Sequence, residues 1–168
     1  MTDINRHQDW LDMIERIKAS NRIHNKNYRQ GYFIPKNWQK CINIVETLTP
    51  IIYRSGWEAD FCQYLDENDA FVRWGSECVK ILYPNPLTGK MSFYHPDFYI
   101  EYIDRTGQYH KELIEIKPRN QAVLKETSNG KDRIEYVKNL KKWEAAIHWC
   151  EKRNIKFRVL TQQDLYRA

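Results

Sequence analysis

The sequence has no long apolar run. No segment of its 168 residues approaches the roughly 20 consecutive apolar residues that cross a bilayer. The N-terminal stretch MTDINRHQDW also lacks an apolar core of signal-peptide length. We therefore expect a cytoplasmic protein that does not associate with membranes. The sequence contains neither internal repeats nor low-complexity tracts, so its organisation is predicted from hydrophobic periodicity and turn residues.

Cysteine is scarce and scattered. Cys41, Cys62, Cys78 and Cys150 form no Cys-x-x-Cys pair, and no histidine lies near them at zinc-finger spacing. This pattern argues against a structural zinc site and favours reduced, mostly buried thiols. The chain is long enough for a single hydrophobic core and too short for two independent ones, which predicts one compact domain.

Positive charge exceeds negative charge and is unevenly distributed. The chain has 27 Lys or Arg against 22 Asp or Glu, a formal net charge of +5. Residues 117–158 hold twelve Lys or Arg and five Asp or Glu, a net charge of seven in that segment. Many proteins are this basic without a specific reason, but a basic segment suits a polyanionic partner such as DNA.

Apolar periodicity predicts an α/β fold. Helical spacing occurs over 10–17, 38–48, from Ser55 onward, and over 134–150. Strand patterns occur over 71–74, 78–83, about 92–103, about 109–117 and 156–160, with a turn at 84–89. This order predicts a mixed sheet of four to five strands flanked by helices. We assign residues 1–50 to a helical extension and residues 51–168 to the core of the same domain.

Two predicted strands carry charged residues where they meet. Asp97 opens one strand and Glu115 and Lys117 close the next, and a turn at 104–107 makes the two an antiparallel hairpin. Side chains two apart on a strand share a face, so Glu115 and Lys117 point the same way. We therefore expect Asp97, Glu115 and Lys117 to converge at one end of the sheet.

Two carboxylates and a lysine at one point suit phosphodiester hydrolysis. Carboxylates bind Mg²⁺ or Mn²⁺, which polarises a phosphoryl oxygen and activates water. A neighbouring ammonium group can position that water or stabilise developing charge. The alternative is an ordinary set of solvated surface ion pairs. The apolar strand sequence around the acids and the strand-ending Pro118 favour the functional interpretation.

Glu58 is a candidate fourth member of this group. It lies near the apolar side of the helix that begins at Ser55, so it can face the sheet. It is also three residues after Ser55, the spacing of an N-terminal capping box. The spacing leaves both roles open.

These motifs resemble the PD-(D/E)XK nuclease superfamily. Pro96-Asp97 followed by Glu115-Ile116-Lys117, with Glu58 on a preceding helix, is similar to its signature. Over residues 53–121 the sequence is similar to the head completion nucleases of T4-like phages. The shared strings are Y-R-S-G-W-E (53–58), Y-L-D (64–66), R-W-G-S-E (73–77), Y-H-P-D-F-Y-I (94–100) and E-I-K-P-R-N-Q (115–121). Similar strings occur in TnsA-like transposon endonucleases.

The resemblance implies a restriction-endonuclease-like fold and a set of roles. It implies Asp97, Glu115 and the Ile116 backbone carbonyl as ligands of Mg²⁺ or Mn²⁺, and Lys117 as the catalytic lysine. It implies Glu58 as an acid acting on the metal or its water, and Gln121 as a polar residue of the site.

DNA contacts are expected from the predicted long helix. Its basic residues are Lys131, Arg133, Lys138, Lys141 and Lys142, which can contact phosphates; the alternative is a solvated helix face. The aromatic residues Tyr28, Tyr32, Phe33 and Trp38 can stack on bases or pack in the core.

Three functions are consistent with these patterns. The first is a metal-dependent DNA endonuclease that processes DNA ends or junctions during phage head completion, in the host cytoplasm or the virion, with portal or neck proteins as partners. The second is a TnsA-like transposon endonuclease, although with eight residues after Leu160 we do not expect the winged-helix domain that such proteins usually carry. The third is a virion neck protein that binds DNA with a nuclease fold but does not cut it. Retention of Asp97, Glu115 and Lys117 argues against the third.

Overall fold

A four-stranded mixed sheet forms the centre of the molecule. The computed structural model describes residues 3–20, 30–122 and 129–165. The sheet order is β3-β6-β7-β8, in which β7 and β8 are parallel and the other neighbours antiparallel. The strands are β3 (Phe71–Ser76), β6 (Phe98–Ile103), β7 (Tyr109–Ile116) and β8 (Lys156–Leu160). The predicted mixed sheet is confirmed.

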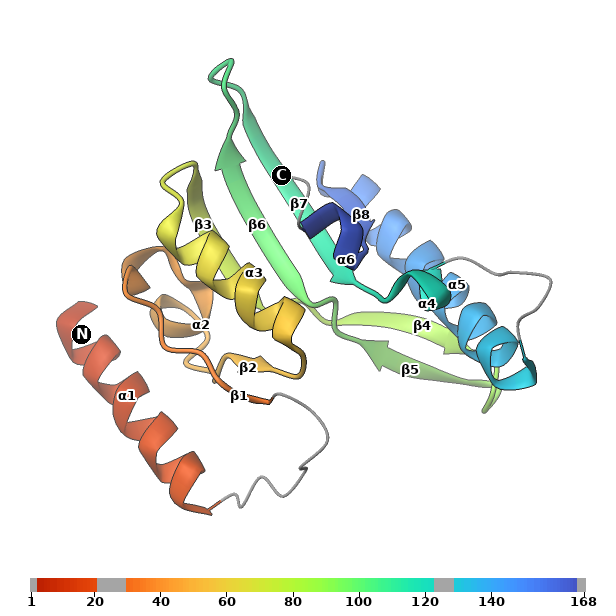
Figure 1. Ribbon diagram of the computed structural model, residues 1–168, viewed down its shortest axis with the longest axis horizontal. Coiled ribbons are helices and arrows are strands. Elements are labelled where there is room, and N and C mark those ends of the chain that lie inside the picture. Colours follow the sequence, from red (N-terminus) through yellow and green to blue (C-terminus); the bar gives the residue numbers. More distant parts are fainter. Residues whose placement is uncertain (1–2, 21–29, 123–128, 166–168) are drawn as a thin grey trace.

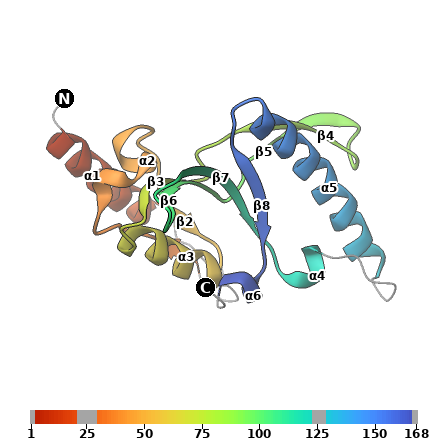
Figure 2. The same cartoon turned by 90° about the horizontal axis from the view of Figure 1, so that it is seen from above.

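Helices cover both faces of this sheet. Figures 1 and 2 show α1 (Asp3–Ser20), α2 (Ile42–Val45) and α3 (Gly56–Glu67) on one side and α5 (Gly130–Glu151) on the other. The smaller elements are β1 (Gly31–Tyr32), a 3-10 turn η1 (Trp38–Lys40), β2 (Ile52–Tyr53), α4 (Arg119–Ala122) and α6 (Gln162–Leu165). The predicted α/β class with a helix-flanked sheet is therefore confirmed. Among residues 3–20, 30–122 and 129–165, every helix is too short or too polar to span a bilayer.

Strand alternation divides the core into two clusters. Phe98, Ile100 and Ile114 pack with α1, α2 and α3, whereas Tyr99 and Leu113 pack toward α5. Successive strand residues point to opposite faces, so a sheet covered on both sides needs apolar residues at nearly every position. The sheet is consequently held in place on both faces, and the end at which β6 begins and β7 ends is firmly positioned.

The N-terminal helix shares this core. Trp10 and Ile14 are fully buried in the same cluster as Phe98, and the Trp10 indole donates to the Thr49 carbonyl at 2.8 Å. Strands β1 and β2 pair across residue 50, the predicted end of the helical extension. The division at residue 50 stays a proposal, because packing joins the two parts into one unit.

The predicted helix over 38–48 is wrong in its length. The structure has a 3-10 turn followed by the single helical turn α2, with Cys41 between them. The backbone of Cys41 forms a single parallel β-bridge with that of Trp74 in β3. This pairing draws the Cys41 backbone out of a continuous helix. The apolar spacing reflects burial of Cys41, Ile42 and Ile44, because tertiary contacts override the local helical pattern here.

The predicted strand over 92–103 is also wrong, because it is two strands. Strand β5 (Lys90–Tyr94) ends before Pro96, and β6 starts after Asp97. Pro96 has no N–H to donate to a ladder. Strand β5 instead pairs with β4 (Ile81–Asn85) in a separate two-stranded ribbon. Strand β4 takes the place of the strand predicted over 78–83 and extends into the turn predicted over 84–89.

The buried side of α5 differs from the predicted one. The helical spacing predicts an apolar side formed by Ile134, Val137, Leu140, Trp143, Ile147 and Cys150. Cys150 is buried and Trp143 packs against the core, but the other four are exposed. The helix packs through the side that carries Asn139, Ala146 and Cys150. The long helix itself is confirmed, but its apolar periodicity identifies the packed side only at Trp143 and Cys150.

Candidate active site

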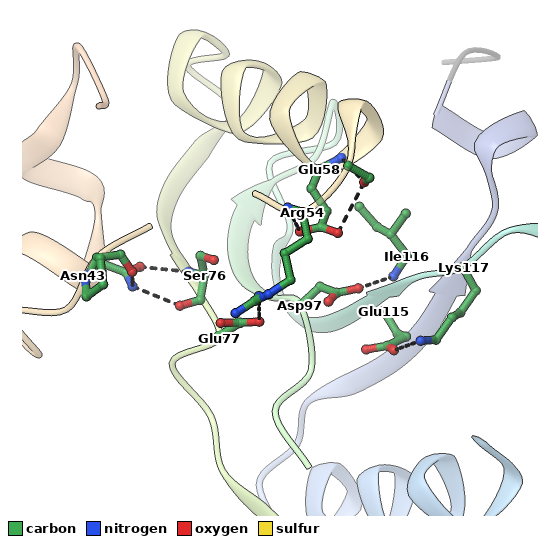
Figure 3. A network of polar contacts seen from close by, with 11 residues as sticks. Asn43, Arg54, Glu58, Ser76, Glu77, Asp97, Glu115, Ile116 and Lys117 are labelled. Atoms are coloured by element: carbon green, nitrogen blue, oxygen red, sulfur yellow. Dashed lines mark hydrogen bonds and ion pairs between the residues drawn. The ribbon is translucent and has the colours of Figure 1, made fainter. Parts of the chain in front are cut away.

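The end of the central sheet brings Asp97 next to the end of β7. Asp97 lies immediately before β6, and the Ile116 N–H donates to Asp97 Oδ2 at 2.7 Å (Figure 3). Ile116 is the last residue of β7, and Glu115 precedes it. The antiparallel pairing of β6 and β7 therefore places the two carboxylates together, as the hairpin predicts.

Both oxygens of the Glu115 carboxylate have partners. The Tyr94 hydroxyl donates to Oε2 at 2.7 Å, and Lys117 Nζ lies 3.0 Å from Oε1. The Glu115 side chain is buried, with 4% exposed, whereas that of Lys117 is 22% exposed. Charge-assisted bonds of this kind are short and strong, so they fix the orientation of Glu115. The structure thus brings together Asp97, Glu115 and Lys117.

Burial and mutual repulsion dominate the electrostatics of the site. Burial raises the pKa of Asp97 well above its ordinary value, and the charges of Glu115 and Glu58 raise it further. The hydrogen bond from the Ile116 N–H and the charge of the Lys117 ammonium group lower the pKa of Asp97 and offset part of this rise. For Lys117, burial would lower the pKa, but Glu115 and Asp97 outweigh it and the net shift is upward.

Glu58 forms the capping box and also lies near Asp97. Its N–H donates to the Ser55 hydroxyl at 3.1 Å, and its Oε2 accepts from the Arg54 N–H at 3.0 Å. These bonds satisfy donors at the start of α3. Burial raises the pKa of Glu58, and the carboxylate is close enough to Asp97 to raise the pKa of that group. Both roles of Glu58 are therefore compatible with its position.

Two ion-paired residues outside the predicted site lie beside these acids. Arg54 forms an ion pair with Glu77, and the Glu77 N–H donates to the Asp97 carbonyl at 3.0 Å (Figure 3). The side chain of Asn43, fully buried, accepts from the Ser76 N–H at 2.8 Å and donates to the Ser76 carbonyl at 2.9 Å. The end of β3 is thereby held against the segment that carries Asp97.

Besides Arg54 and Glu77, Tyr94 is a third residue near the acids that was not predicted from the sequence. It belongs to the string Y-H-P-D-F-Y-I, but the continuous strand predicted there conceals the break at Pro96. That break lets Tyr94 and Asp97 approach Glu115 from two different strands. Arg54 and Glu77 likewise lie within the strings quoted above, and those strings are the signal that could have found them.

The basic residues of α5 do not share one exposed side. Lys142 is half-buried, with Nζ 5.4 Å from the Tyr94 ring centroid and 5.8 Å from that of Tyr83. Its pKa is lowered by burial and by the nearby charges of Lys117 and Lys138, so this lysine lies at the edge of the site. Lys141 pairs with Glu144 at 3.2 Å.

The remaining candidates lie further out. Lys131 and Arg133 are exposed in the first turns of α5. Gln121 is exposed on α4, and within the described part of the chain no contact joins its side chain to Asp97, Glu115 or Lys117. The functional roles of these three residues stay predictions.

The aromatic candidates pack against other rings. The Phe33 ring lies edge-on to Trp74, and Trp38 stacks on His7 at 4.5 Å between ring centroids. Tyr32 packs against the core cluster. Tyr28 lies outside the described residues. Core packing therefore accounts for the aromatic candidates that the structure describes.

The donor set suits a hard divalent cation held by two carboxylates. Asp97 Oδ2 accepts from Ile116, while Asp97 Oδ1 has no hydrogen-bond partner within residues 3–20, 30–122 and 129–165. Across the same ranges, no three acidic, cysteine or histidine side chains are grouped to hold an ion, and Glu58 turns its carboxylate back toward Arg54 and Ser55. Mg²⁺ commonly binds through one or two carboxylates with water and phosphate completing its shell.

Two comparisons with known proteins agree with this geometry. A family model described as TnsA-like endonuclease N terminal matches residues 68–162, which include β3 to β8 and Asp97, Glu115 and Lys117. The chain is also 37% identical over 145 residues to the head completion nuclease of Enterobacteria phage T4. That alignment covers 80% of this chain and 92% of the relative. The chain therefore belongs to the TnsA-like endonuclease family that its motifs indicate, and is homologous to a phage head completion nuclease.

Proposed function

We propose that the protein is a metal-dependent DNA endonuclease that processes DNA ends or junctions during phage head completion, after packaging. The observation that carries the proposal is the convergence of the partly buried Asp97 carboxylate with the buried Glu115 carboxylate, with Lys117 Nζ at 3.0 Å from Glu115. The homologous phage nuclease supports the biological setting. DNA is the proposed substrate, and portal or neck proteins are the proposed partners, in the host cytoplasm or on the virion.

Asp97 and Glu115 would hold the cation, Mg²⁺ or Mn²⁺, together with the Ile116 backbone carbonyl. When bound, such an ion supplies Lewis-acid polarisation of the phosphate and a water of lowered pKa. The hydrogen bonds from Ile116 and Tyr94 fix the two carboxylates before substrate arrives. A site of this kind loses little free energy to reorganisation when the reaction begins.

Lys117 acts on the reacting groups. Glu115 holds its ammonium group at the sheet end, and the pKa of Lys117 is raised, so the side chain stays protonated. A positive charge there orients the attacking water and stabilises the negative charge that develops on the phosphoryl oxygens. Glu58 would accept a proton from that water or bind the ion once its side chain turns away from Ser55, and Gln121 would contribute a polar contact from α4.

Phosphates on either side of the cut would contact the basic residues of α5. Lys138 and Lys142 lie on the side of that helix nearest Tyr94, and Lys131 and Arg133 continue the positive charge toward its start. Such contacts supply affinity and position the strand without reading its sequence. Lys141 would join them after leaving Glu144.

A TnsA-like transposon endonuclease is the second candidate, favoured by the family model that matches residues 68–162. The two candidates differ in what they require. We expect a head completion nuclease to cut DNA ends or branches by itself, and a TnsA-like transposon endonuclease to cut transposon ends as the partner of a transposase. Cutting of forked or overhanging DNA by the purified chain alone therefore favours the first.

The acids and the lysine should each be essential for cleavage. Asp97→Ala, Glu115→Ala and Lys117→Ala are each expected to lower the rate by about 100-fold or more, because each removes a group used in chemistry. The measurement uses forked, overhanging and blunt DNA in Mg²⁺, Mn²⁺ or EDTA, with circular dichroism to verify folding. Cleavage in EDTA would contradict the metal requirement, and full activity of a variant would remove that residue from the site.

Asp97→Asn should stabilise the metal-free protein while abolishing cleavage. An acid whose pKa is raised on folding favours the folded state below its unfolded pKa, and this stability is lost as pH rises through the folded pKa. The amide carries no charge and still accepts from Ile116, so the melting temperature in EDTA at neutral pH should rise. The same change at exposed Asp9 of α1 is the control. A lower melting temperature for Asp97→Asn would contradict the repulsion described here.

Two substitutions separate the roles of Glu58. Glu58→Gln keeps a capping-box residue but removes the carboxylate, and we expect a rate loss of about tenfold or more with little change in stability. Ser55→Ala is the matched control, because it removes the cap and should lower stability by about 1 kcal/mol while preserving the carboxylate and activity. If Glu58→Gln instead lowers the melting temperature and leaves the cleavage rate unchanged, Glu58 serves only to cap the helix.

Removing positive charge from α5 should weaken DNA binding uniformly. For Lys138→Ala with Lys141→Ala, the slope of log affinity against log salt should become shallower by about 0.7 to 0.9 for each phosphate that a lysine no longer neutralises. Lys142 is left intact because it lies beside Tyr94. Lys18→Ala with Lys36→Ala is the control, since both lysines are surface residues paired with acids. An unchanged slope in the α5 variant would show that this helix side is merely solvated.

A further inference from the structure

The β4–β5 ribbon, residues 81–94, is a separate element beside the active site. It does not pair with the central sheet, and it extends from the sheet end where β6 begins (Figure 1). Ile81, Tyr83 and Tyr94 are buried on one side of it and pack with α5. Contacts with α5 therefore anchor the ribbon through one face.

The opposite face of the ribbon is apolar and exposed. Leu82 pairs with Phe93 and Pro84 pairs with Met91, so these four side chains share that face. Leu82 is 53% exposed, Phe93 55% and Met91 59%, and Leu87 in the connecting turn is 55% exposed. A contiguous apolar patch of this kind on a folded protein usually marks an interaction site.

The charge of the ribbon indicates what binds there. Residues 79–94 include Lys80 and Lys90 but no Asp or Glu. Lys80 Nζ lies 3.7 Å from the Phe93 ring centroid, so a cation and an aromatic ring are presented together. This combination suits a nucleic acid strand, whose bases stack on apolar and aromatic side chains while lysines attract its phosphates.

A short chain segment joins the ribbon to the proposed cleavage centre. Tyr94, the last residue of β5, donates to Glu115, and Asp97 follows three residues later. Four residues of extended chain span at most about 14 Å, so Phe93 lies within about four base steps of a phosphate held at Asp97. A strand cut at Asp97 can therefore reach the ribbon.

We infer that the apolar face formed by Leu82, Pro84, Met91 and Phe93 binds unpaired bases of the DNA substrate next to the cut. The inference rests on the proposed nuclease function and deepens it by naming the substrate class as DNA with a single-stranded segment, such as a fork or an overhang. Paired bases in a duplex are already stacked and present phosphates outward, so they offer little to an apolar face. Unpaired bases expose their apolar faces and gain from stacking.

Binding without catalysis tests the inference. The variant Leu82→Thr, Met91→Thr, Phe93→Thr removes the apolar face with residues that favour strands, and fluorescence anisotropy in EDTA compares forked with blunt DNA. We expect affinity for the fork to fall by about tenfold or more, because base stacking is removed. Blunt duplex affinity should change by less than about twofold, and the salt slope should stay unchanged, since every lysine and arginine is retained.

The controls separate stacking from folding. Val72→Thr with Ile103→Thr removes two exposed apolar strand residues of the central sheet and should leave fork binding unchanged. A single Phe93→Thr should weaken fork binding, and Phe93→Tyr should retain it. Equal losses on fork and blunt DNA, or no loss on either, would overturn the inference, and the second result would assign the face to a protein partner. Failure of the wild type to cut any DNA in Mg²⁺ or Mn²⁺ would instead overturn the proposed function.

Discussion

Repulsion between the partly buried Asp97 carboxylate and the buried Glu115 carboxylate is the constraint around which the rest of the site is arranged. Buried charges without partners cost several kcal/mol each, and here two of the same sign lie together. The structure offsets this with the Ile116 N–H on Asp97 and with Tyr94 and Lys117 on Glu115. These donors come from more than one strand, so the strand ends must meet in the correct register for the acids to be held.

The surrounding elements fix that register. Pro96 follows the end of one strand and allows Asp97 to leave the ladder, while Tyr94 stays in the ribbon and reaches Glu115. The segment before β6 is held from the other side as well, because the Glu77 N–H donates to the Asp97 carbonyl. Asn43 in turn bonds both backbone groups of Ser76, so even the short helix α2 contributes to the position of Asp97. The packing of the fold therefore determines the geometry of the site.

The sequence predicted the sheet and its central acids well, because hairpin pairing and strand alternation are local rules. Asp97, Glu115 and Lys117 follow from a turn and a period of two. Sequence reasoning failed where long-range contacts decide the structure. The β-bridge between the Cys41 and Trp74 backbones interrupts a helix that periodicity favoured. The packed side of α5 carries Asn139, Ala146 and Trp143, whereas Ile134, Val137, Leu140 and Ile147 are exposed. The contact between Tyr94 and Glu115 did not follow from strand alternation either, because it depends on where β5 separates from β6.

Positive charge lies close to the acids, but not all of it is paired with them. Lys117 is already engaged with Glu115, and Arg54 with Glu77. Lys142 is held over the Tyr94 ring and is repelled by Lys117 and Lys138, so it gains little from the protein alone. A phosphate arriving beside Glu115 would relieve that repulsion among the lysines, and a divalent cation would relieve the repulsion between the acids. In the proposed nuclease site, residues that destabilise the free protein would then be the ones that favour its ligands, a balance between stability and activity that is expected of catalytic sites.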